Sequence, residues 1–305
     1  MSRRRKGRLM QRAEYLAYRA ISGAIRSMSE ERVYRWGTRF GAFCGILLRG
    51  RRKLALRNLR AAFPEKRDDA IRAIAKECWR HFGRQLLLFV QMQRMPKEEV
   101  LAHCDLVNRE IFDDAVAAGR GVIIISAHYG SWEVGGLVVT SIANRVHTVA
   151  RRLDNEFLER DLAQLRARTG AEVIDRRHAA RPLLKALEEH AVIVLLPDQA
   201  VLPREGVLAP FLGRPAWTTP APARFAIRSG STIVFAFCIP HETRHRLEFE
   251  EPIRVGRLSE LERDPVALTA RINEVIARRI AARPELWLWM HDRWKGTGES
   301  EVIDG

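Results

Sequence analysis

The feature that most constrains the fold is an alternation of apolar runs and helical patterns that begins near residue 122. Residues 122–126 and 192–196 are continuous apolar runs, as expected of strands that are buried on both faces of a sheet. Further strand-like runs at residues 146–150, 171–174 and 232–239 are separated by stretches with helical periodicity. This alternation predicts an α/β fold with a mainly parallel central sheet flanked by helices.

Residues 1–60 follow a different pattern and predict a helical extension ahead of the sheet. Apolar side chains recur at helical spacing over residues 9–28, and residues 30–48 predict a second helix whose glycines are four residues apart. We expect residues 1–60 to form a basic amphipathic helical segment that associates with a membrane. Residues 61–295 would then form the main domain, and residues 296–305 a C-terminal tail.

The charge of the chain limits its partners. Lys and Arg number 52 against 37 for Asp and Glu, which gives a formal net charge of +15. Such a charge attracts nucleic acid, anionic lipid head groups or an acidic carrier protein. The apolar stretch at residues 40–48 lies between Arg39 and Arg49 and is about half as long as the roughly 20 residues of a spanning helix. It predicts a helix in the membrane interface; the alternative is a buried helix of the main domain.

Polar residues follow two of the predicted strands. His128 lies just beyond the run at residues 122–126, and Asp198 lies just beyond the run at residues 192–196. In such sheets, ligands bind outside the carboxyl ends of the strands. Glu133 falls in the first turn of the next helix, where its carboxylate can accept the Nδ1–H of His128 and leave Nε2 as a base. The alternative is that both are ordinary loop residues.

Several other chemistries lack their sequence patterns. There is no Gly-x-Ser-x-Gly motif and no cysteine close to His128, so this residue is expected to activate a substrate hydroxyl rather than a protein nucleophile. The chain has no His-Glu-x-x-His motif and no phosphate-binding loop. We therefore expect no cofactor and no metal.

The segment Ala127-His128-Tyr129-Gly130-Ser131-Trp132-Glu133 resembles the His-x4-Asp/Glu motif of glycerolipid-type acyltransferases. It is most similar to that of the bacterial lipid A late acyltransferase family, which has Glu in the second place. Further segments resemble this family in the same order: Asn58-Leu59-Arg60-Ala61-Ala62-Phe63-Pro64, Asp198-Gln199, Gly206-Val207, Pro210-Phe211-Leu212-Gly213-Arg214-Pro215, Thr218-Thr219-Pro220, Pro284-Glu285-Leu286-Trp287-Leu288-Trp289 and Arg293-Trp294-Lys295. The resemblance covers nearly the whole chain, from about residue 10 to residue 295.

The resemblance implies a glycerolipid-acyltransferase-like fold and the transfer of a fatty acyl group to a hydroxyl of a membrane lipid, most closely a lipid A precursor. The implied donor is an acyl-carrier protein thioester or acyl-CoA, and the implied location is the cytoplasmic face of the bacterial inner membrane. His128 would take the hydroxyl proton, and Glu133 would orient and stabilise the imidazolium. Arg151 resembles an arginine of the family that would contact the oxyanion or a lipid phosphate, although Arg152 could serve as well. Asp198 would position Arg151 or the acceptor; its alternative role is that of a turn residue.

The sequence also allows other interpretations. The acceptor could be a glycerolipid, an aminolipid or a phosphoinositide mannoside. A basic nucleic-acid-binding protein is an interpretation from another class, but the arginines are spread along the chain and no nucleic-acid-binding module is recognisable, so we expect no nucleic-acid partner. A non-catalytic protein with this fold would not need His128 and Glu133. The C-terminal tryptophans Trp287, Trp289 and Trp294 predict either a membrane-interface belt or, preferably, packing against the sheet.

Overall fold

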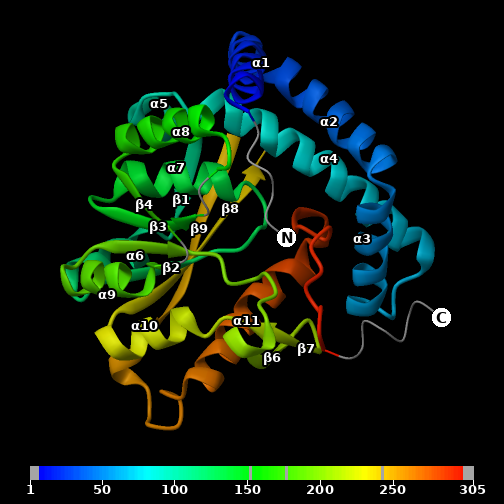
Figure 1. Ribbon diagram of the computed structural model, residues 1–305. Coiled ribbons are helices and arrows are strands. Elements are labelled where there is room, and N and C mark those ends of the chain that lie inside the picture. The colour runs from blue at the N-terminus through cyan, green and yellow to red at the C-terminus, as the bar shows by residue number, and fades with distance from the viewer. Residues whose placement is uncertain (1–6, 151–152, 176–177, 242–243, 298–305) are drawn as a thin grey trace.

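The computed structural model describes residues 7–150, 153–175, 178–241 and 244–297. A central sheet of seven strands has helices on both faces, and a two-stranded hairpin lies apart from it (Figure 1). The helices are α1 Arg8–Arg26, α2 Glu30–Leu47, α3 Arg49–Ala62, α4 Asp68–Met92, α5 Lys97–Ala102, α6 Arg109–Ala117, α7 Trp132–Ile142, α8 Glu156–Thr169, α9 Ala180–Glu188, α10 Ala221–Ser229 and α11 Pro265–Ala282. The strands are β1 Cys104–Val107, β2 Val122–Ile125, β3 Val146–Ala150, β4 Ala171–Asp175, β5 Val192–Leu195, β6 Val207–Phe211, β7 Arg214–Thr218, β8 Thr232–His241 and β9 Arg244–Arg254.

The central sheet has the strand order β1-β9-β8-β2-β5-β3-β4. Strands β8, β2, β5, β3 and β4 run parallel to one another, whereas β9 pairs with β8 antiparallel and β1 runs parallel to β9. The predicted α/β fold with a mainly parallel sheet is therefore confirmed. Strand β1 and the hairpin of β6 and β7 were not expected from the sequence, because Asp105 interrupts β1 and a proline, which strands disfavour, occurs in both β6 and β7.

Strand β2 shows why the sheet is covered on both faces. All four of its residues are buried, and their side chains alternate between two hydrophobic clusters. Ile123 and Ile125 pack with the helices α9, α10 and α11, whereas Val122 and Ile124 pack with α6 and α7. A strand that is buried on both faces needs apolar residues at every position, and this is the pattern that residues 122–125 show.

The N-terminal helices are not a detached extension. Ala55 and Leu59 of α3 belong to the main hydrophobic cluster, together with Ile71 and Ala75 of α4. The predicted boundary at residue 60 thus falls within a helix that packs on the core, and the division into a membrane segment and a main domain stays a prediction. Among the described residues, no helix is both long enough and apolar enough to cross a bilayer.

Helices α2 and α4 approach each other very closely. Gly37, Gly41 and Gly45 of α2 are buried, and a Cβ at Gly41 would overlap the backbone carbonyl of Trp79 in α4. Gly83 of α4 similarly leaves no room for a side chain beside α2. The four-residue glycine spacing therefore fixes which face of α2 turns inward, because only this face is free of side chains.

Candidate active site

His128 is held in a loop that leaves the carboxyl end of β2. Gly130 has a φ of +62°, and a Cβ at this position would overlap the carbonyl oxygen of Cys238, so the turn requires glycine. The backbone N–H of Ser131 donates to that same carbonyl at 2.7 Å. The loop is thereby fixed to β8 immediately after His128.

The carboxylate next to His128 is that of Asp198. The Nδ1 atom of His128 lies 2.9 Å from Oδ1 of Asp198, and the backbone N–H of His128 donates to Oδ2 at 3.0 Å. The reason lies in the sheet register, which pairs Ile125 of β2 with Leu195 of β5. His128 and Asp198 each stand three residues beyond these partners and meet at the same edge of the sheet.

This contact changes the roles expected from the sequence. There, the Nδ1 contact was assigned to Glu133, and Asp198 was expected to position Arg151 or the acceptor. In the structure Asp198 occupies the position at Nδ1, because the strand order brings β5 beside β2. Since an ionised carboxylate is only an acceptor, Nδ1 carries the proton and Nε2 is left as the basic nitrogen.

Trp287 completes the environment of Asp198. Its indole Nε1–H donates to Oδ2 of Asp198 at 2.8 Å, and both side chains are only 1% exposed. Burial by itself raises the pKa of Asp198, but the neighbouring His128 and the donated hydrogen bonds outweigh it and lower the pKa below its ordinary value. Asp198 is therefore an ionised carboxylate whose orientation is fixed by groups on both sides.

The pKa of His128 is raised above its ordinary value. Burial works in the opposite direction, but the charge and hydrogen bond of Asp198 outweigh it, with a smaller contribution from the charge of Glu133. His128 keeps 24% of its side chain exposed, whereas Asp198 is almost completely enclosed. The pair thus combines a reachable base with a buried partner, which is the arrangement that general-base catalysis uses.

Glu133 lies at the start of α7, exposed and beside the cavity described below. The indole Nε1–H of Trp132 donates to its Oε1 at 3.2 Å. The ring of Trp132 in turn lies 5.6 Å from the ring of His128, centroid to centroid. Glu133 is therefore close enough to influence the charge of His128. Arg151 and Arg152 follow the carboxyl end of β3 and lie outside the described residues.

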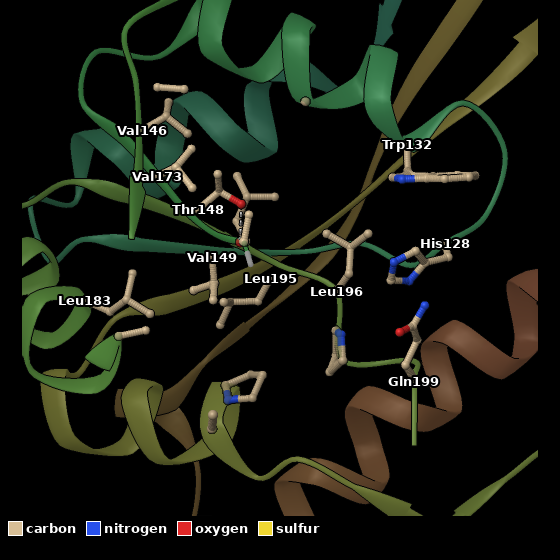
Figure 2. A pocket seen from close by; sticks show the side chains of 18 of the residues that line it. His128, Trp132, Val146, Thr148, Val149, Val173, Leu183, Leu195, Leu196 and Gln199 are labelled. Atoms are coloured by element: carbon tan, nitrogen blue, oxygen red, sulfur yellow. Dashed lines mark hydrogen bonds between the residues drawn. The ribbon is translucent and has the colours of Figure 1, made fainter. Parts of the chain in front are cut away.

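A cavity of about 760 Å³ extends from His128 along the sheet. Figure 2 shows His128, Trp132 and Gln199 at one end, with Val146, Val173 and Leu183 toward the other. Its lining is mostly aliphatic and comes mainly from β3, β4, β5, α7, α8, α9 and α10, with Phe89 of α4. Such a long apolar cavity with a base at its end suits a hydrocarbon chain whose reactive group stays beside His128.

His81 and the C-terminal segment, which were not expected at the site from the sequence, hold the loop of residues 128–130 in place. His81 of α4 is fully buried, and its Nε2 lies 3.0 Å from the carbonyl oxygen of Gly130. Burial lowers the pKa of His81 to about 3, so its ring is neutral and Nε2–H donates to this carbonyl. The C-terminal segment contacts the same loop through two backbone hydrogen bonds. The N–H of Gly130 donates to the carbonyl of Leu286, and the N–H of Leu288 donates to the carbonyl of His128.

The C-terminal tryptophans pack inside the protein. Trp287, Trp289 and Trp294 are between 0 and 2% exposed, so the preferred interpretation as packing residues is confirmed and a membrane belt is excluded for them. The sequence linked this segment to the family pattern and to packing against the sheet, but not to Asp198. Its proximity to Asp198 could not be read from the chain, because 89 residues separate Trp287 from Asp198. Within the described part of the chain, no group of three His, Cys, Asp or Glu side chains is placed to hold a metal ion.

Two known proteins of similar sequence are named as acyltransferases. The chain is 25% identical over 268 residues to the lipid A biosynthesis lauroyltransferase of Escherichia coli, covering 86% of this chain and 85% of the relative. It is 27% identical over 290 residues to the phosphatidylinositol mannoside acyltransferase of Mycolicibacterium smegmatis, covering 92% and 90%. The crystal structure of the 1-acyl-sn-glycerophosphate acyltransferase of Thermotoga maritima aligns with a TM-score of 0.41 and 12% identity, over 84% of this chain and 98% of that one.

Residues 1–296 match the sequence pattern described as bacterial lipid A biosynthesis acyltransferase, which is nearly the whole chain. The relatives just described are named as acyltransferases as well. This chain is therefore an acyltransferase and belongs to the bacterial lipid A biosynthesis acyltransferase family.

Proposed function

We propose that this enzyme transfers a fatty acyl group from a thioester, acyl-carrier protein or acyl-CoA, directly to a hydroxyl of a membrane lipid. The observation that carries the proposal is the pairing of His128 with the buried Asp198 at the end of a long apolar cavity. In this proposal the acyl chain occupies the cavity, and the thioester carbon lies beside Nε2 of His128. The family and its named relatives support acyl transfer to a lipid as the reaction.

In the proposed mechanism, Nε2 of His128 removes the proton of the acceptor hydroxyl as the oxygen attacks the thioester carbonyl. The tetrahedral intermediate collapses, the C–S bond breaks, and the thiolate takes the proton back from His128. Asp198 stabilises the imidazolium and keeps the ring in the required tautomer, and the charge of Glu133 adds to this stabilisation. No acyl-enzyme forms. Arg151 stays our candidate for contacting the oxyanion or a lipid phosphate.

The acceptor that we propose is a lipid A precursor at the cytoplasmic face of the inner membrane, in line with the lauroyltransferase of Escherichia coli. A specific observation favours a second candidate. The phosphatidylinositol mannoside acyltransferase of Mycolicibacterium smegmatis is 27% identical and covers a larger share of the chain. A mannosylated phosphoinositide is therefore the alternative acceptor.

Purified enzyme should be incubated with acyl-carrier protein thioesters or acyl-CoA and with each acceptor in detergent, and product formation followed by mass spectrometry. We expect wild type and the control His178→Ala, which changes an exposed histidine, to form acylated lipid. His128→Ala should abolish transfer, and Glu133→Ala should reduce it. Acyl transfer that survives both substitutions would refute the proposed mechanism, and transfer to one acceptor only would decide between the two lipids.

A further inference from the structure

The outward face of α2 carries large apolar side chains in contact with solvent. Trp36, Phe43, Ile46 and Leu47 have exposed fractions of 52, 59, 66 and 64%. At helical spacing they lie on the side opposite the glycines that pack on α4. We use the term outer face of α2 for these four residues together with Arg32 and Arg39.

The exposure of this face is enforced by packing. The glycine side of α2 touches the backbone of α4 so closely that the helix cannot turn to bury its aromatic side chains. Figure 1 shows α2 on the outer side of α4, which separates it from the sheet. Exposed apolar groups gathered on one rigid face mark an interaction surface.

The charge around this face identifies the partner. From residue 32 to residue 64 the chain has no Asp or Glu, whereas Arg32, Arg35, Arg39, Arg49, Arg51, Arg52, Lys53, Arg57 and Arg60 are cationic. The guanidinium of Arg39 lies 5.6 Å from the ring centroid of Trp36. Aromatic and aliphatic side chains flanked by arginines suit the boundary between lipid head groups and acyl chains. A second copy of this chain would fit poorly, because a symmetric contact would bring arginines against arginines.

We propose that the outer face of α2 binds an anionic lipid surface, with the helix lying in the plane of the interface. Trp36, Phe43, Ile46 and Leu47 enter the lipid, and Arg32 and Arg39 contact its phosphates. The proposal rests on the proposed function in one respect, namely that the acceptor of this enzyme resides in a membrane.

Helix α4 connects the outer face of α2 to the loop that carries His128. One side of α4 holds α2 through Gly83 and Trp79, and its buried His81 contacts the carbonyl of Gly130, two residues after His128. Phe89 of the same helix lines the cavity. A membrane bound to α2 would therefore lie at a fixed position relative to His128.

Sedimentation with vesicles tests the surface. Wild type should bind vesicles of phosphatidylcholine mixed with phosphatidylglycerol, and Trp36→Ala/Phe43→Ala should weaken this binding about tenfold or more, because two exposed aromatic rings no longer enter the lipid. The matched control Leu208→Ala/Leu261→Ala removes apolar side chains that are 47 and 87% exposed elsewhere and should bind as wild type does. Unchanged binding of the α2 variant, with circular dichroism showing a folded protein, would overturn the proposal.

A second pair of variants tests whether the arginines of the outer face of α2 are needed for lipid binding. Arg32→Gln/Arg39→Gln should weaken binding to anionic vesicles, whereas Arg228→Gln/Arg263→Gln, which changes exposed arginines on other elements, should not. Equal binding of wild type to phosphatidylcholine alone would contradict an anionic partner. Retention on an immobilised acidic protein without any vesicle binding would assign the face to a protein instead.

Activity measurements separate this proposal from the proposed function. Trp36→Ala/Phe43→Ala should lose acyl transfer to an acceptor embedded in vesicles and keep it with the same acceptor dispersed in detergent. Equal loss with both forms of the acceptor would overturn the docking role. If wild type binds anionic vesicles but transfers no acyl group to any acceptor, the proposed function fails while the lipid-binding surface stands.

Discussion

Nδ1 of His128 and Oδ1 of Asp198 lie 2.9 Å apart, although 70 residues separate them in the chain. The contact joins the ends of two neighbouring parallel strands and places a buried negative charge behind a partly exposed imidazole. Through it, the basicity of Nε2 depends on a residue outside the His-x4-Glu motif.

Replacing Asp198 by Asn keeps its shape and removes its charge. We expect Asp198→Asn to lower kcat by about a hundredfold or more, because the imidazolium loses its buried counter-ion and the Nδ1 tautomer is no longer enforced. Steady-state kinetics with a thioester donor measures the effect. Asp113→Asn, which alters an exposed carboxylate paired with Arg109, is the matched control and should behave as wild type does. A wild-type kcat for Asp198→Asn would remove Asp198 from the mechanism.

The raised pKa of His128 predicts the pH dependence of the reaction. A general base works only when it is neutral, so kcat/KM should fall as the pH drops through the pKa of His128. Since this pKa is raised, the midpoint of the fall should lie above the value of about 6.5 for an ordinary histidine. In Asp198→Asn, the carboxylate charge that raises the pKa of His128 is lost, whereas burial still lowers this pKa. The midpoint of the fall in kcat/KM should therefore move to lower pH. A pH–rate profile of both proteins checks the sign of the shift, which a purely structural role of Asp198 would not produce.

The indole of Trp287 offers a test of how Asp198 is positioned. Trp287→Phe keeps an aromatic ring and removes the N–H that donates to Oδ2, and we expect kcat to fall about tenfold with little change in the KM for the donor. Trp289→Phe is the control. It also removes a buried indole hydrogen bond, to the carbonyl of Pro284, and should cost similar stability without lowering kcat. Equal kcat values for the two variants would show that the contact with Asp198 contributes nothing specific.

Gly136 should influence which acyl chains fit the cavity. It lies one turn beyond Trp132 on α7, lines the cavity, and has open space where a side chain would start. We expect Gly136→Leu to reduce kcat/KM for long-chain donors about tenfold relative to short-chain donors, because the new side chain occupies part of the apolar space. Competition between thioesters of different length measures this ratio. Gly50→Leu, at a helical glycine that also faces open space, should leave it unchanged. An unchanged ratio in Gly136→Leu would mean that the acyl chain does not occupy this part of the cavity.

The sequence by itself determined the class of the fold and indicated His128 as the candidate base. Continuous apolar runs at residues 122–126 and 192–196 can only be strands buried on both faces or helices in a core, and the helical patterns between such runs select the first. His128 could be chosen because a polar residue directly after such a strand stands where ligands bind. The four-residue spacing of the glycines in residues 30–48 is likewise a property of the sequence alone. These properties depend on neighbours along the chain.

The tertiary structure alone decided what surrounds His128. The order of the strands in the sheet depends on how the whole chain packs. Because β5 lies beside β2, Asp198, rather than Glu133, is the carboxylate at Nδ1 of His128. The same holds for His81 of helix α4, which contacts the loop that carries His128, and for Trp287 of the C-terminal segment, which contacts Asp198. A hydrogen bond between distant segments requires only one suitable residue in each segment. It therefore produces no repeating pattern that could be recognised in a single sequence.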